Sequence, residues 1–475
     1  MAKEVQGKQI AKNVSLSLFA QVVSLAVSFI TGLIVPRFID EFQYAYWHTF
    51  LLYVSYVGVL HFGLLDGIVL RYSQYDYEEL DKKQIRSQFV MLLIINTVAL
   101  LMVIAYGISQ GGLSQIIALL VASGILTKNI FTYNSLLFQI TNRIQHYAAL
   151  VIAKRIVYGL LVVLLIAAGQ GNFIWYCLAD LAGDCAGIML SLAVNKDLHF
   201  GSLLSVKDML QETWTNISSG ILLMFSNWSS MLLVSGARMM IEWKWGTLVF
   251  GKSSFAFSVS DLILTFVTAI SVVLFPSLKR MKQEKLPAFY KKLRDMMTPF
   301  LFWSLLLYYP GCWILEKWLP KYTSSLAYLG LLAPMVVYAS LVSILTNNYL
   351  KAFRQERVLL RINVLAVMLS ACLYTISAYW IQNLTVMLLA VVLIIMLRSV
   401  VSEFCVMRLI GVEFKKDFLL EFVLTCAFLF STQCFTKLQG FCLYLACLLI
   451  YFYIHLDTVK AIARQVKALI GRKSG

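Results

Sequence analysis

The sequence predicts an all-α, polytopic membrane protein with about fourteen transmembrane helices. Of the 475 residues, 60% are hydrophobic and only 13% are charged, and the mean hydropathy is +0.78. A soluble protein of this length carries about a quarter charged residues. Apolar runs of about twenty residues also recur along the whole chain, which is the length that crosses the hydrocarbon core as a helix.

Short polar segments separate the apolar runs, and counting the runs between them gives the number of spans. Connectors such as SQGGLSQ and GQGN are short enough for tight hairpins. The first run follows three lysines and is longer than a signal-peptide core, so we expect it to be retained as a helix. The predicted spans cover residues 13–36, 45–69, 88–109, 114–139, 148–169, 173–195, 214–237, 247–275, 297–319, 325–346, 362–381, 384–407, 418–436 and 440–457.

The distribution of lysine and arginine predicts the orientation. With the N-terminus inside, 29 of the 40 basic residues fall on the inner side, 6 on the outer side and 5 within spans. Such an excess of basic residues on one side marks the cytoplasmic face. Both termini are therefore predicted to be cytoplasmic. The net charge of +16 follows from this topology and does not indicate nucleic-acid binding.

Two basic segments are predicted to fold as helices outside the spans. They are LKRMKQEKLPAFYKKLRDMM, in the middle of the chain, and the tail DTVKAIARQVKALIGRKSG. Val459, Ile462, Val466 and Ile470 share one face of the tail helix, as expected for a helix lying on anionic membrane lipids.

Motifs for enzyme or metal chemistry are missing from the sequence. The nine cysteines include no CxxC pair, and the five histidines are scattered. We therefore interpret the cysteines as packing residues and expect no catalytic residue, no metal and no organic cofactor.

A weak internal repeat predicts two lobes. VPRFIDEFQYAYW follows the first span and SGARMMIEWKWGT follows the seventh, and each places an arginine four residues before a glutamate (Arg37 and Glu41; Arg238 and Glu242). Six spans separate the copies, so both halves point the same way, as in two-lobed transporters. The predicted domains are an N-lobe at residues 1–200, a C-lobe at 201–410, and two additional helices with a basic tail at 411–475.

Charged side chains within the spans are the candidate functional residues, because a charge at bilayer depth is costly unless it has a partner or faces water. The basic ones are Lys128, Lys154, Arg155, Lys252 and Arg398. The acidic ones are Asp66, Asp180, Asp184, Asp261 and Glu403. Asp180 and Asp184 are four residues apart and so share one helix face.

Each of these charges allows more than one interpretation. Lys154, Arg155 and Lys252 could extend to the nearer interface, and Asp66 could cap its helix or pair with Arg71. Lys128 and Arg398 are too central for that and are expected to face a polar interior. There they either form ion pairs with the acidic residues or bind an anion such as a diphosphate.

Several segments resemble the polysaccharide flippases. HFGLLDGIVLRYSQY, at the end of the second span, resembles their LGL-small-small-x-x-R signature, with Arg71 at the arginine and Asp66 within the motif. FQITNRIQHYAAL, LFPSLKRM and LPKYTSSLAYLGLLAP are similar to later stretches of the same family. The resemblance covers nearly the whole chain, and the number of spans agrees with it.

The resemblance implies a flippase of the multidrug/oligosaccharidyl-lipid/polysaccharide superfamily. Such a protein moves undecaprenyl-diphosphate-linked oligosaccharides from the inner to the outer leaflet of the bacterial cell membrane, for O-antigen, capsule or a related polymer. It implies two lobes around a V-shaped, cationic central cavity that opens alternately to each side. Polysaccharide polymerase and glycosyltransferases are the implied protein partners. Arg71 is expected to be structural.

On this resemblance, the five basic residues within the spans contact the diphosphate and sugar, with docking near Lys128 and Arg398. Asp180 and Asp184 would bind the coupling ion, Na⁺ or H⁺, because neighbouring carboxylates titrate as a coupled unit. The first span lacks the carboxylate of drug/cation antiporters and the arginine of lipid II flippases, which favours the O-antigen or capsule branch.

Three other classes remain as alternatives. A cation-coupled multidrug antiporter would share the fold. A membrane glycosyltransferase or polymerase would need a large outer loop, and the predicted outer loops are short. A membrane scaffold would need no central lysines. The sugar, the coupling ion, the oligomeric state and the conformational state are not predictable from the sequence.

Overall fold

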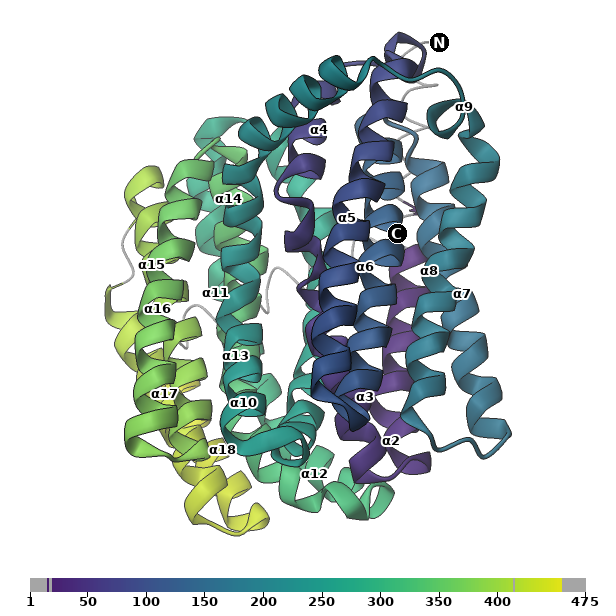
Figure 1. Cartoon of the computed structure of the whole chain (residues 1–475). Helices are drawn as coiled ribbons and strands as arrows, with labels where there is room; N and C mark the ends of the chain where they lie inside the picture. Colours follow the sequence, from purple (N-terminus) through teal and green to yellow (C-terminus); the bar gives the residue numbers. More distant parts are fainter. Residues whose placement is uncertain (1–14, 17–18, 413–414, 455–475) are drawn as a thin grey trace, which may run out of the picture. The chain divides into compact units, whose positions relative to one another are not determined.

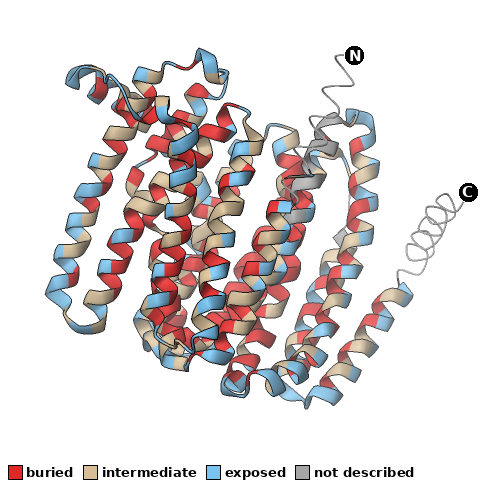
Figure 2. Ribbon diagram, turned by 90° about the vertical axis from the view of Figure 1, so that its right-hand side faces the viewer, coloured by how far each residue is buried: buried red, intermediate tan, exposed pale blue. Residues whose placement is uncertain are grey.

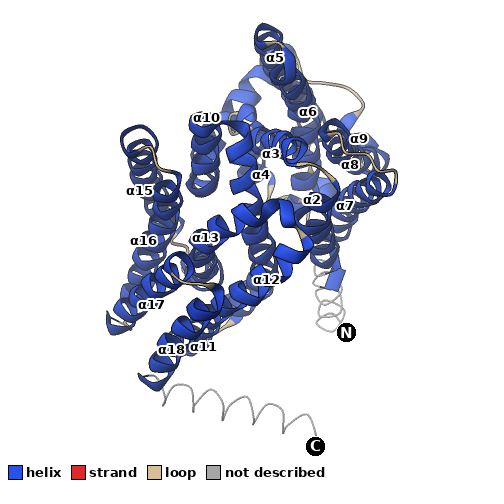
Figure 3. Cartoon of the chain, turned by 90° about the horizontal axis from the view of Figure 1, so that it is seen from below, coloured by secondary structure: helices blue, strands red, loops and turns tan. Residues whose placement is uncertain are grey.

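The computed structural model describes residues 15–16, 19–412 and 415–454, and within these ranges it is helical with no β-strand (Figure 3). The chain divides into two compact units, Met1–Ser254 and Phe255–Gly475. The predicted lobe boundary at residues 200/201 and the pseudo-symmetry of the lobes stay predictions. The basic tail helix with Val459, Ile462, Val466 and Ile470 lies outside the described residues.

The first unit is a bundle of long helices. A first span, Phe19–Phe38, ends in α2. Its helices are α2 (Val35–Phe38), α3 (Glu41–Ser55), α4 (Leu64–Tyr72), α5 (Lys82–Gln110), α6 (Gly112–Ile140), α7 (Ile144–Ala167), α8 (Phe173–Val194), the short α9 (Lys196–His199) and the first part of α10 (Val206–Arg280). The helices α5, α6, α7 and α8 run side by side (Figure 1).

The second unit contains the rest of α10 and the shorter helices after it. These are α11 (Leu286–Ser304), α12 (Tyr308–Trp318), α13 (Thr323–Leu341), α14 (Asn347–Ala352), α15 (Glu356–Thr375), α16 (Leu384–Ile410), α17 (Lys415–Cys434) and α18 (Lys437–Ile454). The basic middle segment, predicted to be helical, forms the start of α11.

The number of spans agrees with the prediction. Twelve helices of the described residues are long and apolar enough to cross a membrane, or thirteen if the bent pair Glu41–His61 and Leu64–Tyr72 is one span. One of the twelve, Val206–Thr268, has 63 residues. At 1.5 Å per residue it would be about 95 Å long, about three times the hydrocarbon thickness. It breaks at Gly246 (φ 81°, ψ 170°) and so supplies two spans. Each predicted span therefore has a helical counterpart, and the fold class is confirmed.

Burial follows the pattern of a membrane bundle. Residues on facing helix surfaces are buried, whereas large apolar side chains such as Leu101, Leu164 and Leu222 are more than half exposed (Figure 2). Exposed apolar surface along entire helices is what lipid covers in a membrane protein. The protein is therefore a multi-pass membrane protein.

The last two helices are packed into the second unit. Tyr444 of α18 donates a hydrogen bond to the Phe302 backbone oxygen of α11 at 3.0 Å. The Tyr338 hydroxyl of α13 lies 2.7 Å from the Thr425 hydroxyl of α17. These hydrogen bonds join buried groups of α17 and α18 to α13 and α11, so α17 and α18 are integral to this unit.

Polar contacts connect the loop after α4 to α9 in the first unit. The Lys82 ammonium lies 2.6 Å from the Asp197 carboxylate, to which the Tyr77 hydroxyl donates a hydrogen bond at 2.6 Å. Partial burial alone would raise the pKa of the Asp197 carboxyl, but the bonds from Lys82 and Tyr77 outweigh it and hold that pKa below the ordinary value.

The signature segment after α3 makes backbone contact with α10 at glycines. A Cβ atom on Gly67 would lie 1.9 Å from the backbone oxygen of Asn216, and one on Gly220 would lie 2.1 Å from the backbone oxygen of Gly63. The spacing of four residues puts each pair on one helix face, the arrangement by which small residues let membrane helices approach closely. The two glycines of the signature therefore determine how α4 meets α10.

Replacing Gly67 by Ala should destabilise the fold, because the added Cβ would overlap the Asn216 backbone and force α4 and α10 apart. We expect a loss of about 3 kcal/mol, at the upper end of the overpacking range, measured as a lower melting temperature in detergent micelles. Gly58→Ala is the matched control, since a Cβ at Gly58 meets nothing within 4 Å. Equal melting temperatures for the two variants would contradict the close contact.

Candidate functional site

Four of the predicted charges meet in the first unit. Lys128 lies on α6, Lys154 on α7, and Asp180 and Asp184 on α8. The Lys128 Nζ lies 2.5 Å from Asp180 Oδ2 and 2.6 Å from Asp184 Oδ2, and the Lys154 Nζ lies 2.5 Å from Asp184 Oδ1. We call these four residues the lysine–aspartate cluster. Asp184 is the centre of the cluster because it binds both ammonium groups.

The sequence of α8 explains why the cluster can form. Asp180, Gly183, Asp184 and Gly187 repeat at intervals of three and four residues and therefore share one face. A Cβ atom on Gly183 would lie 2.8 Å from the backbone oxygen of Lys154. The missing side chain lets α7 approach α8 closely enough for the Lys154 ammonium to reach the carboxylate on the same face.

The cluster is buried and electrically balanced. The side chains of Lys128, Lys154 and Asp180 are 17%, 16% and 9% exposed, and that of Asp184 is fully buried. Two ammonium groups face two carboxylates, so the cluster has no net charge when all four are ionised. The Lys154 ammonium also lies 4.4 Å from the centre of the Phe131 ring, a favourable cation–π distance.

Arg155 gives this region an excess positive charge. Its side chain is half-buried and interacts electrostatically with Asp180. Three basic groups therefore face two acidic groups within one helical bundle. The remaining positive charge can attract an anion such as a phosphate.

The other two predicted basic residues lie apart from the cluster. The Lys252 ammonium lies 3.6 Å from the Glu41 carboxylate, and both side chains are more than one third exposed. Arg398, on α16 of the second unit, is 9% exposed and donates a hydrogen bond from Nε to the Asn363 side-chain oxygen at 3.0 Å. Asn363 on α15 is thus a polar partner of the buried Arg398, and the predicted role of this arginine in substrate binding stays a prediction.

Two of the predicted acidic residues, Asp261 and Glu403, also lie outside the lysine–aspartate cluster. Asp261, in the second part of α10, is exposed. Glu403 of α16 is buried and pairs with Arg294 of α11, with a distance of 2.8 Å between its Oε2 and the arginine Nε. Arg294 lies in the basic segment that was predicted to fold as a helix outside the spans, and its burial was not predicted. The helix begins at Leu286, about ten residues before the predicted span, and places Arg294 in the interior.

The signature residues Asp66 and Arg71 bind different partners. Asn227 donates a hydrogen bond to Asp66 at 3.3 Å, whereas Arg71 binds Glu212 at 2.6 Å and Asn216 at 2.6 Å. Pairing of Asp66 with Arg71, one of the two options left open, is not observed. Five residues turn a helix by about 140° beyond one full turn, so the two side chains point to different faces. Arg71 links α4 to α10, which agrees with the structural role expected for it.

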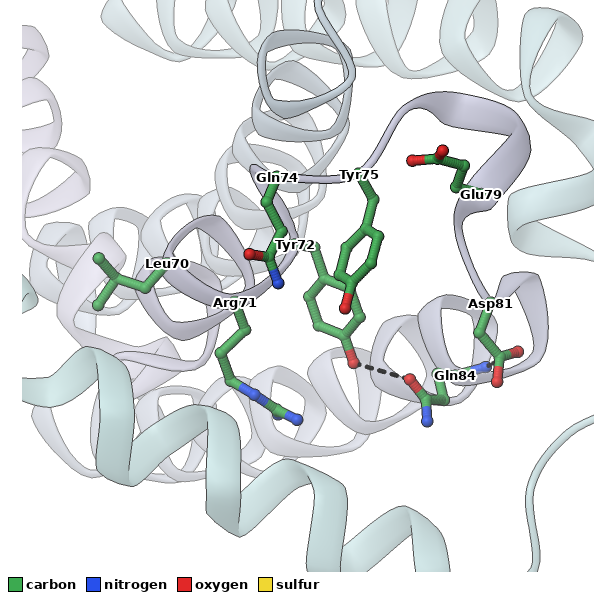
Figure 4. Close-up of a pocket in the computed structure, with 8 residues that line it drawn as sticks. All are labelled: Leu70, Arg71, Tyr72, Gln74, Tyr75, Glu79, Asp81 and Gln84. Atoms are coloured by element: carbon green, nitrogen blue, oxygen red, sulfur yellow. Dashed lines mark hydrogen bonds between the residues drawn. The ribbon is translucent and has the colours of Figure 1, made fainter.

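A polar pocket of about 440 Å³ lies beside Arg71, where the chain passes from α4 to α5 (Figure 4). The Tyr72 hydroxyl donates a hydrogen bond to the Gln84 side chain at 3.0 Å across this pocket. The lining residues are Leu70, Arg71, Tyr72, Gln74, Tyr75, Glu79, Asp81 and Gln84. Neither the pocket nor the partners of Arg71 follow from the hydropathy pattern of the sequence.

Metal ligation has no candidate in the described part of the chain. No group of three or more histidine, cysteine or acidic side chains there is arranged to hold a metal ion. The nine cysteines are all free. The chemistry available to the lysine–aspartate cluster is therefore ion pairing, anion binding and proton transfer.

Removing the central carboxylate should destabilise the first unit. We expect Asp184→Asn to lower the free energy of unfolding by about 3 kcal/mol or more, because two buried ammonium groups would then share one carboxylate. Thermal unfolding in detergent measures this loss. The control is Glu41→Gln at the exposed pair with Lys252, where the expected loss is below about 1 kcal/mol. Similar losses in both variants would show that the cluster is not a buried network.

Comparison with known proteins supports the fold. The sequence matches no family model and no curated protein sequence. Among solved structures, it is similar to an inward-facing multidrug resistance MATE family transporter of the MOP superfamily, with a TM-score of 0.62 and 12% identity over 82% of this chain and 98% of that chain.

Two further solved structures have the same fold. The lipid II flippase MurJ, in an inward closed conformation, matches with a TM-score of 0.58 and 14% identity over 94% of this chain and 100% of that chain. A MOP superfamily transporter from Pyrococcus furiosus matches with a TM-score of 0.53 and 12% identity over 84% of this chain and 96% of that chain. At these identities the likeness shows the fold.

Proposed function

We propose that this protein is a membrane transporter of the MOP superfamily that translocates a polyprenyl-diphosphate-linked oligosaccharide from the inner to the outer leaflet. The lysine–aspartate cluster with Arg155 is the observation that carries the proposal. It provides buried, positively charged groups within the first unit, and a diphosphate is the part of such a substrate that needs them. The substrate polymer would be O-antigen, capsule or a related surface polysaccharide.

The extent of the structural matches supports a flippase. The match to the lipid II flippase covers 94% of this chain, and the match to the MATE transporter covers 82%. Helices α17 and α18 correspond to the two additional spans expected after the two lobes. The flippase match covers more of this chain than the drug-transporter match, which favours the flippase.

The cluster suggests how a diphosphate would be held. In the present arrangement, each lysine ammonium is satisfied by a carboxylate. A diphosphate arriving at Lys128 would replace Asp180 as its acceptor, while Asp184 keeps Lys154 in position. The released Asp180 carboxyl would then bind a proton or remain ionised in the electrostatic field of Arg155. Anion binding and a change in the ionisation of Asp180 would in this way be linked at one site.

Flipping of a labelled substrate in proteoliposomes tests the proposal. The probe is a fluorescent undecaprenyl-diphosphate-linked oligosaccharide whose exposure on the outer surface is followed with a membrane-impermeant quencher. Wild-type protein should equilibrate the probe between leaflets. Lys128→Gln combined with Asp180→Asn should reduce the initial rate at least tenfold, because it removes one positive charge together with its partner and leaves a balanced, foldable pair.

The control for this experiment is Lys437→Ala, which removes an exposed ion pair with Glu316 at the start of α18. This variant should flip the probe at the wild-type rate. Wild-type flipping by the double variant, at equal reconstituted amounts, would refute a role for Lys128 in transport. No flipping by wild-type protein would refute the substrate class.

A cation-coupled multidrug antiporter is the second candidate function. The MATE structure gives the higher TM-score, 0.62 against 0.58 for the flippase. Asp180 and Asp184 would then bind the cation. The same vesicles, loaded with a cationic dye and given a Na⁺ or H⁺ gradient, distinguish the two functions. Dye extrusion without lipid flipping would favour the antiporter.

A further inference from the structure

A second buried charge network lies in the second unit and is centred on Arg294. The guanidinium Nε lies 2.8 Å from Glu403 Oε2, and Nη2 lies 2.7 Å from Glu421 Oε1. The three side chains come from α11, α16 and α17 and are only 3%, 1% and 2% exposed. One arginine therefore stands between two carboxyl groups in the buried interior of the unit.

The charges of this network do not balance. Arginine remains protonated in proteins, so the guanidinium supplies one positive charge. Two ionised carboxylates would leave one negative charge in excess among these buried side chains. Uncompensated burial of an ion costs several kcal/mol, and a group in that position takes up a proton instead. The lysine–aspartate cluster in the first unit has no such excess.

A polar group with no hydrogen-bond partner lies next to the network. The Tyr290 hydroxyl, one helical turn before Arg294 on α11, is fully buried and makes no hydrogen bond. It interacts electrostatically with Glu403, Arg294 and Glu421. A hydroxyl in this position can accept a hydrogen bond from a protonated carboxyl group or donate one to an ionised carboxylate. The network therefore has a partner for either ionisation state.

Asp417 connects the network to the surface. It lies one turn before Glu421 on α17, 3.3 Å from the Arg294 Nη1, and its side chain is 20% exposed. Asp417 is the partly exposed acid of the three, whereas Glu421 and Glu403 are both buried. Other titratable groups that interact with the network or its neighbours are Tyr290 and Asp295 on α11, Tyr338 on α13, Tyr349 on α14 and Tyr451 on α18.

We propose that Arg294, Glu403 and Glu421 form a proton-binding site, in which the two buried carboxyl groups hold one proton between them at neutral pH and exchange it with water through Asp417. The guanidinium at the centre repels metal cations, so the ligand is H⁺ and not Na⁺. The site lies wholly within the second unit. It does not depend on the proposed transport substrate.

Infrared difference spectroscopy of the purified protein in H₂O and D₂O tests the site. A protonated carboxyl group gives a C=O stretching band that is distinct from that of a carboxylate and shifts on deuteration. Wild-type protein should show a band that is missing from both Glu403→Gln and Glu421→Gln. Either substitution leaves a single buried carboxylate, which stays ionised beside Arg294. Both single variants should keep the wild-type melting temperature, because neither leaves a buried carboxyl group in excess of the arginine.

Matched variants make the outcome decisive. Glu316→Gln, at a partly exposed acid paired with Lys437, should leave the band unchanged. Asp417→Asn should keep the band but slow its shift in D₂O at least tenfold. A wild-type protein without the band, or a band that persists in both glutamine variants, would overturn the site. An unchanged exchange rate in Asp417→Asn would overturn the route through Asp417.

Discussion

Compensation of buried charge is the constraint on which this structure depends. A bundle that is 60% hydrophobic can hold ammonium, guanidinium and carboxylate groups in its interior only where opposite charges meet. Asp184 meets this requirement for two lysines at once, and the helices α6, α7 and α8 are held together around it. The glycine face of α8 permits the close helix approach that such short ion pairs need.

The two units use this constraint differently. In the first unit, the lysine–aspartate cluster is neutral, and Arg155 adds a positive charge beside it. In the second unit, Arg294 faces more acid than it can neutralise. An excess of positive charge suits an anionic substrate, and an excess of carboxyl groups suits a proton. On these two proposals, substrate binding and proton binding occur on different units of the same chain.

Much of this arrangement was predictable from the sequence because hydropathy and charge spacing are local signals. The fourteen spans follow from apolar runs, and the pairing of Lys128 with Asp180 and Asp184 was one of two options left by their position in the spans. The Arg294 network was missed, because KKLRDMM has the composition of a solvated basic connector. Glu421 was not singled out either, although it lies within a predicted span.

The contact of Gly67 with Asn216 was also missed, since it joins residues about 150 positions apart. Its only sequence signal is the spacing of four residues between Gly63 and Gly67 and between Asn216 and Gly220, which is typical of close helix pairs. Such spacing is frequent by chance in a chain with 25 glycines. Which helices meet is decided by tertiary packing, and a single sequence contains little information on that.

The central claim is that Lys128 and its neighbours bind a lipid diphosphate, and the most direct measurement is the affinity for undecaprenyl diphosphate without sugar. Titration calorimetry in detergent at constant salt, with wild-type protein and with Lys128→Gln/Asp180→Asn, gives this quantity. The account predicts saturable binding to wild-type protein and at least tenfold weaker binding to the double variant. Equal affinities for the two proteins would contradict it.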